Sequence, residues 1–324
     1  MSVADSLRRT ALGLLSPAGS RGRLMILSFH QVPRDADEMA PGTPPAAVFE
    51  QQMRWVADYC NVLPLPEAAA RLGEGTLPAR AACITFDDGY ADNVEVAAPV
   101  LQRLGLSATF FITAGAVEEG IMWNDLVIEG VRRANGVLDL GDLGLGIHEL
   151  ADDAARRAAV PAVIDQLKYR QLTPRLNTAQ EIFSRATGEA PPRMMMSKAQ
   201  VAELAEQGFD VGAHTINHPI LKELTADEAR REIEESRDWV RNVTGEMPRS
   251  FAYPNGRPGI DFEPEHEDMV EEAGFSVAVS TQWACAKKSD PAFALPRFTP
   301  WERERGAFWQ RLAKTAIQSY TGGG

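Results

Sequence analysis

The sequence lacks long apolar runs, paired cysteines and an excess of positive charge. No run of about 18 apolar residues occurs in its 324 residues, so we expect no transmembrane segment. The formal net charge of −12 at pH 7 argues against binding of nucleic acid or an anionic membrane through bulk charge. The three cysteines form no CxxC pair and are odd in number, which favours a reducing compartment over a disulfide framework.

The N-terminus also lacks the hydrophobic stretch of a secretory signal. Arg8 and Arg9 precede an apolar segment that runs only from Ala11 to Leu15 and is interrupted by Gly13. A secretory core is longer, about 7–15 apolar residues. We therefore expect a cytoplasmic protein, for which peripheral contact with a membrane is not excluded.

Short apolar runs recur along the chain and indicate buried parallel strands, because they do not alternate between polar and apolar residues. They span residues 24–29, 81–86, 108–112, 209–214, 250–253 and 276–280, with a weaker one at 294–298. Helix-like segments lie between them, at 46–59, 94–104, 197–207, 225–242 and 262–273. This alternation predicts an α/β fold in which helices surround a parallel sheet or barrel.

The interval 114–196 breaks the alternation. It contains the sequence WND at 123–125, a glycine-rich patch at 141–146 and several helical runs, so we expect a helical insertion within one domain. The predicted organisation is an N-terminal extension over 1–23, a main domain over 24–300, and a C-terminal helix and tail over 301–324 that ends in a disordered TGGG.

Two adjacent aspartates, Asp87 and Asp88, directly follow the apolar run at 81–86. Neighbouring side chains in a strand point to opposite faces, so both can face one site only where the strand has ended. Gly89 gives the chain the freedom to turn there. The pair is thus expected at the carboxyl end of a strand, where α/β enzymes place their sites. An acidic loop with one helix-capping aspartate is the alternative.

Two of the five histidines, His214 and His218, lie in one loop after the run at 209–214. Two surface histidines are the default interpretation of this spacing. With an aspartate from another strand end, they would form a two-histidine, one-carboxylate metal site that leaves a position for water. One aspartate of the pair could then bind the ion, and the other could act as general base toward a water whose pKa the metal lowers to roughly 7.

Two further features follow strand-like runs. The turn from Tyr253 to Gly256 could wall a groove and offer backbone N–H groups to an oxyanion, or be a purely structural turn. His30 closes the first run and lies on the same rim if the strands are parallel. A buried, hydrogen-bonded histidine is the usual role of such a residue, and a general acid that protonates a leaving amine is the functional one.

The motifs TFDDGY, HTINH and FAYPNG, in this order and spacing, resemble those of the polysaccharide deacetylases, the family built on the NodB homology domain (carbohydrate esterase family 4). The resemblance covers about residues 24–300. It implies a distorted (β/α)7 barrel that removes N- or O-acetyl groups with a divalent metal, usually zinc. It assigns Asp87 as the base and Asp88, His214 and His218 as metal ligands.

The sequence departs from the family pattern at the third motif, which usually carries an arginine that orients the base. The aligned residues are Ala252 to Gly256, without arginine, and Arg249 or Arg297 could replace it. By the same alignment the oxyanion donor is the backbone N–H of Asn255, with Tyr253 beside it in the substrate groove.

The family's late leucine–histidine motif, which carries the general acid, is also absent from the run at 294–298. The branch that deacetylates exported poly-N-acetylglucosamine places its acid histidine just after the first strand, where Phe29 and His30 stand here. The resemblance therefore assigns His30 as the acid. Trp123, in a segment similar to an exopolysaccharide-type bacterial subgroup, could line the groove or pack in the core.

We expect a metal-dependent deacetylase that hydrolyses N-acetyl groups of an amino-sugar polysaccharide, oligosaccharide or precursor and releases acetate. One alternative keeps the chemistry but takes a small amide, imide or formamide as substrate. A cytoplasmic location would suit such a substrate, or a lipid- or nucleotide-linked sugar precursor. The second alternative is a non-catalytic carbohydrate-binding protein on the same fold.

Overall fold

Seven of the eight strands of one parallel sheet follow the order β1-β3-β4-β7-β8-β9-β10, and this sheet curls until its edges meet. The strands are β1 (Met25–Phe29), β3 (Ala81–Phe86), β4 (Thr109–Ile112), β7 (Asp210–Ala213), β8 (Ser250–Ala252), β9 (Val277–Trp283) and β10 (Leu295–Arg297). The N–H of Ser28 donates to the Phe298 carbonyl and the N–H of Phe298 donates to the Ile26 carbonyl, which joins the two edges. The computed structural model, which describes residues 3–318, thus confirms the predicted distorted seven-stranded barrel. The TGGG tail lies outside the described residues.

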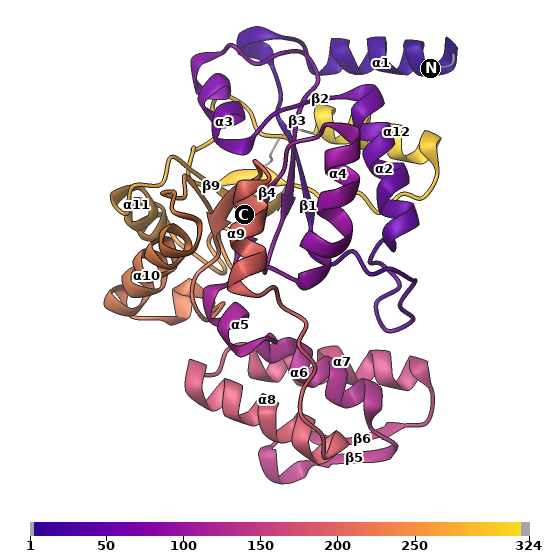
Figure 1. Ribbon diagram of the computed structural model, residues 1–324, viewed down its shortest axis with the longest axis vertical. Helices are drawn as coiled ribbons and strands as arrows, with labels where there is room; N and C mark the ends of the chain where they lie inside the picture. The colour runs from indigo at the N-terminus through magenta and orange to yellow at the C-terminus, as the bar shows by residue number, and fades with distance from the viewer. Residues whose placement is uncertain (1–2, 319–324) are drawn as a thin grey trace.

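Helices surround the barrel (Figure 1). They are α1 (Val3–Leu15), α2 (Ala46–Tyr59), α3 (Leu65–Glu74), α4 (Ala98–Leu104), α9 (Lys198–Glu206), α10 (Ala226–Thr244), α11 (Pro264–Glu272) and α12 (Arg305–Ile317). Short elements complete the barrel region: β2 (Asn61–Val62), which pairs with β3, a π-helical turn (Asn93–Ala97), and 3-10 turns at Gly19–Arg21 and Leu221–Glu223. Ser197 and Thr225 form the capping boxes that their spacing indicates. None of the described helices is long and apolar enough to cross a membrane.

The insertion leaves the barrel after β4 and returns before α9, and Figure 1 shows it at one end of the barrel. It contains α5 (Ala114–Glu119), α6 (Trp123–Arg133), β5 (Gly136–Leu140), a 3-10 turn (Gly141–Leu143), β6 (Gly146–Leu150), α7 (Asp153–Leu167) and α8 (Leu172–Thr187). Its helices share a separate hydrophobic cluster that includes Val127, Val163 and Phe183. The sequence predicts a helical insertion, but the insertion also contains an antiparallel hairpin, which turns at the glycine-rich patch at 141–146.

The carboxyl ends of the strands and the insertion lie at the same end of the molecule. The barrel leads into α5 directly after β4, and the neighbouring strands β3 and β7 end beside it. Asp87 and Asp88 follow β3, and His214 follows β7. The parallel order of the strands thus gathers the predicted site residues at one rim, next to the insertion.

Candidate active site

Asp87 follows β3, and its carboxylate is bound by the guanidinium of Arg297 from β10. Arg297 Nη1 lies 2.7 Å from Asp87 Oδ1 and Nη2 lies 2.8 Å from Oδ2, a bidentate pair. Both residues are buried, with 2% of Asp87 and 1% of Arg297 exposed. Burial opposes ionisation of Asp87, but the charge and hydrogen bonds of Arg297 hold its pKa below the ordinary value. Asp87 is therefore a carboxylate held in one orientation.

Arg297 is itself fixed from two sides. Its Nη1 donates to Thr85 Oγ1 at 3.1 Å, and its Nε donates to the Ser280 carbonyl at 3.0 Å. Arg249, the other arginine that the sequence offered, is exposed directly before β8, at the opposite end of the strands from Asp87. The suggestion that Arg249 orients the base is therefore wrong.

Asp88, His214 and His218 bring three potential metal ligands together. Asp88 Oδ1 lies 3.5 Å from Nε2 of each histidine, and the ligand atoms all lie within 4.8 Å of one another. His214 Nδ1 donates to the Ala252 carbonyl at 2.7 Å, which leaves Nε2 available to a metal. Asp88 Oδ1 is buried and has no hydrogen-bond partner within residues 3–318. One carboxylate oxygen and two imidazole nitrogens fit the donor set of a zinc-type ion.

Burial and mutual interactions shift the pKa values of these three side chains. Burial lowers the pKa of His218 to about 3, so its imidazole is neutral at pH 7. Burial also favours neutral His214, but the adjacent carboxylates of Asp88 and Asp87 outweigh it and raise the pKa of His214. Burial opposes ionisation of Asp88, yet the two histidines hold its pKa well below the ordinary range. The three side chains are thus electrostatically coupled.

The loop that carries the histidines has an unusual backbone conformation. Thr215 and His218 have φ values of 64° and 51°, a left-handed region that costs energy for residues with a Cβ. Thr215 Oγ1 donates to the His214 carbonyl at 2.5 Å and accepts from the His218 N–H at 3.1 Å. Asp88 has a φ of 75° as well. Contacts from outside the loop must therefore hold this conformation.

Two buried charged residues from other segments supply those contacts. Glu232 of α10 accepts the backbone N–H of Ile216 and of Asn217, both at 2.9 Å. Arg175 of α8 donates to the carbonyls of Asn217 at 2.8 Å and of His218 at 3.4 Å. Neither residue was predicted from the sequence, because no short motif marks a partner that lies on a remote helix.

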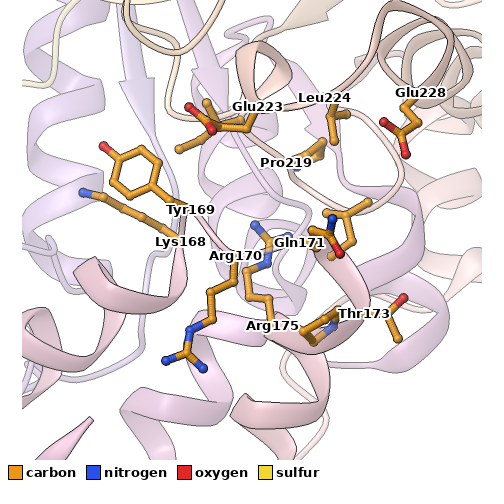
Figure 2. Close-up of a pocket in the computed structure, with 13 residues that line it drawn as sticks. Lys168, Tyr169, Arg170, Gln171, Thr173, Arg175, Pro219, Glu223, Leu224 and Glu228 are labelled. Carbon is orange, nitrogen blue, oxygen red and sulfur yellow. The ribbon is translucent and has the colours of Figure 1, made fainter. Parts of the chain in front are cut away.

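Arg175 also borders a cavity of about 350 Å³ between the insertion and the chain that follows His218. Lys168 and Tyr169 line it from the turn before α8, and Pro219 and Glu223 line it from the other side. Figure 2 shows Arg175 extending from the insertion toward the segment that contains Pro219. The insertion therefore contacts the histidine loop directly.

His30 follows β1 and reaches the same rim. Its Nε2 lies 3.9 Å from Asp87 Oδ2, and 53% of its side chain is exposed. Because the His30 imidazole lies beside the buried carboxylate and is also exposed to solvent, it can contact a substrate bound next to Asp87. The general-acid role of His30 stays a prediction.

The turn after β8 differs from the expectation. Tyr253 is 1% exposed and stacks on Phe262 at a centroid distance of 3.8 Å, so its ring belongs to the core. The prediction that its side chain lines the groove is therefore wrong. Asn255 is exposed with a φ of 58°, and its carbonyl accepts from Thr281 Oγ1 at 2.6 Å. No hydrogen bond of the described part of the chain uses the Asn255 N–H.

Trp123 begins α6 and lies over the guanidinium of Arg175, at 4.7 Å from the ring centroid. Its ring is mostly buried among the apolar side chains of the insertion. It also lines a cavity of about 220 Å³ together with Asn217 of the histidine loop. Of the two roles that the sequence left open for Trp123, groove lining and core packing, core packing therefore dominates.

Comparisons with known proteins identify the family of this chain. The family model for polysaccharide deacetylase matches residues 74–278. YxkH of Bacillus subtilis strain 168, which carries the name of a polysaccharide deacetylase, is 22% identical over 278 residues, or 85% of this chain and 70% of that protein.

Solved structures share the fold at low identity. The Streptococcus pyogenes deacetylase PplD in complex with acetate has a TM-score of 0.61 at 18% identity and covers 91% of this chain and 98% of its own. IcaB from Ammonifex degensii has a TM-score of 0.56 at 20% identity, over 94% of this chain and 99% of its own. With the family match over more than half of its length, the chain belongs to the polysaccharide deacetylase family, hydrolases that act on the amide bonds of N-acetyl groups.

Proposed function

We propose that this protein is a divalent-metal-dependent deacetylase that hydrolyses N-acetyl groups of an amino-sugar polysaccharide, oligosaccharide or precursor and releases acetate. One observation supports it most. Asp87, held by Arg297, is the immediate neighbour of Asp88, which faces His214 and His218. A base and a metal ligand on adjacent residues can act on one water molecule from two sides.

Each step can be given to a residue of this chain. Asp88, His214 and His218 would hold the ion, which when bound supplies a Lewis acid for the acetamide carbonyl and a lowered pKa for water. Asp87 takes the proton of the attacking water, because Arg297 keeps it ionised and oriented. The backbone N–H of Asn255 donates to the oxyanion.

His30 completes the reaction at the exposed side of Asp87. Its imidazolium donates a proton to the amide nitrogen, so that the carbon–nitrogen bond breaks and the amine leaves as a neutral group. The acetyl carbon retains the oxygen from water, and the products are acetate and a free amino sugar. Because His30 Nε2 lies 3.9 Å from Asp87 Oδ2, both side chains could act on the same acetamide group.

Chelation should abolish acetate release, and added Zn²⁺ should restore it. The assay measures acetate, or formate for a formamide, from N-acetylglucosamine, its oligosaccharides and a set of small amides and formamides. Release from the sugars alone supports the proposal, and release from the small amides alone supports the small-amide alternative. No product from any compound, together with oligosaccharide binding, would identify a carbohydrate-binding protein instead.

Arg175→Met should weaken metal binding by about 10- to 100-fold, as losses of outer-sphere contacts typically do. The substitution removes the donor to the carbonyls of Asn217 and His218, so the loop can relax away from its strained conformation. Competition with a chelator of known zinc affinity measures the change. Arg170→Met is the matched control, because Arg170 donates to the Leu143 carbonyl within the insertion. Equal weakening in both variants would contradict this role of Arg175.

A further inference from the structure

A third cavity, of about 410 Å³, lies beside the reacting residues between the barrel rim and α6. We call it the acidic cavity and define it by Gln31, Tyr90, Asp92, Asp125, Glu129 and Arg132. Gln31 follows His30, and Tyr90 lies two residues after Asp88. A chain of sugars whose N-acetyl group reaches Asp87 would therefore extend into this cavity or pass along it.

The carboxylates of the acidic cavity are unequally paired. Glu129 accepts from Arg132 Nε at 2.9 Å, and Arg132 also forms a bidentate pair with Asp37 at 2.8 and 2.7 Å. In contrast, neither Asp92 nor Asp125 has an ion pair with any lysine, arginine or histidine of residues 3–318. The cavity thus contains two carboxylates without a cation.

Asp125 is the more exceptional of the two. It is 2% exposed, and its Oδ1 accepts from Tyr90 Oη at 3.3 Å. Its Oδ2 is buried and has no hydrogen-bond partner in the described part of the chain. A buried carboxylate oxygen without a partner is costly unless a counter-charge or a donor compensates it. Burial, with the nearby charge of Asp88, raises the pKa of Asp125 to about 7.

Asp92 provides a second carboxylate in the same cavity. Its Oδ2 accepts the Val32 N–H at 2.9 Å, and its Oδ1 accepts from Asn93 Nδ2 at 2.9 Å. These hydrogen bonds fix the carboxylate but add no positive charge. Burial raises the pKa of Asp92 to about 7. A cationic group that enters the cavity would favour the ionised form of both acids and satisfy the free oxygen of Asp125.

We propose that the acidic cavity binds the ammonium group of a glucosamine unit, so that the enzyme prefers chains that already carry a free amine near the N-acetyl group under attack. The choice of an amino sugar rests on the proposed function, whose product carries this amine. The volume suits such a ligand, since small-molecule sites span about 300–1,000 Å³. Each turnover would then create the group that recruits the next stretch of the same chain.

The test is binding of a glucosamine tetramer and of an uncharged glucose tetramer of the same linkage, neither of which can be deacetylated, at neutral pH, measured by calorimetry with metal-loaded enzyme. Wild type should bind the glucosamine tetramer more tightly. Asp125→Asn should weaken that binding about tenfold, the ratio for one charge-assisted hydrogen bond. Asp92→Asn should act in the same direction. Glu206→Gln, at the exposed end of α9, removes the same charge and should change nothing.

Equal affinity of wild type for the two tetramers would overturn the proposal, as would the same loss in Glu206→Gln as in Asp125→Asn. The glucosamine tetramer has no acetyl group, so its binding is measured without hydrolysis. Failure of acetate release with intact, Asp125-dependent binding would reject only the proposed function. Thermal unfolding checks the variants, and Asp125→Asn should unfold no earlier than wild type because it removes an unpaired buried charge.

The same preference should appear in turnover. A tetramer with one glucosamine unit should have a kcat/KM about tenfold above that of the fully acetylated tetramer in wild type. In Asp125→Asn the ratio should fall to near one. A ratio that stays at the wild-type value in this variant would contradict the assignment of Asp125.

Discussion

Asp87→Asn should lower turnover by about 10²- to 10⁴-fold, the usual contribution of a general base. Asparagine keeps the shape of the side chain but cannot accept the proton of the attacking water. The metal ligands Asp88, His214 and His218 are unchanged, so metal content should equal that of wild type. Acetate release measures the rate, and elemental analysis of the purified protein measures the metal.

Asp88→Ala is the control that separates the two aspartates. It removes a ligand oxygen that lies 3.5 Å from both histidines, so both metal content and activity should fall. Near-normal turnover in Asp87→Asn would exclude Asp87 as the base. Loss of metal in Asp87→Asn would show instead that the two carboxylates share the ion.

The parts of this site that could be predicted from sequence are those carried by contiguous motifs at strand ends. Asp87 and Asp88 come directly after an uninterrupted apolar run, and His214 closes another, so local pattern alone placed them on one rim. The strands themselves were predictable for the same reason, because buried parallel strands are short apolar runs. The order of the strands in the sheet comes from the structure.

Residues that act across the barrel were harder to predict. The sequence offered both Arg249 and Arg297. Arg249 is excluded because it lies directly before β8, and closure of the sheet brings Arg297 to the base. The edge contact of Phe298 with β1 places β10 near β3, which brings Arg297 to Asp87. Glu232 and Arg175 support the histidine loop from remote helices. Nothing in the sequences of these helices distinguishes the two residues from other charged side chains.

Tyr253 illustrates a different limit of prediction. A motif locates a residue along the chain, but at a strand end it does not determine to which side the ring turns. Stacking on Phe262 removes the ring from water, and this burial of two aromatic faces outweighs exposure in a groove. The hairpin of β5 and β6 was not predicted, because its glycine-rich patch lies among helical runs and the interval as a whole indicates a helical insertion.

Arg297→Met should destabilise the protein by about 3–5 kcal/mol, because it leaves the Asp87 carboxylate buried without its counter-charge. Methionine retains much of the side-chain volume, so the loss reports the charge more than a cavity. Activity should fall as well, since protonation of the unpaired Asp87 would remove the base. Denaturant unfolding and acetate release measure the two effects.

The double variant Asp87→Asn/Arg297→Met distinguishes a charge effect from a packing effect. If the unpaired charge of Asp87 causes the instability, removing it should restore much of the lost free energy of unfolding, while activity stays absent. A double variant no more stable than Arg297→Met would assign the loss to the hydrogen bonds of Arg297 with Thr85 and Ser280. Arg297→Lys keeps the charge without the bidentate geometry, so it should lose more activity than stability. Stability therefore reports the buried ion pair, and turnover reports the orientation that this pair gives to the base.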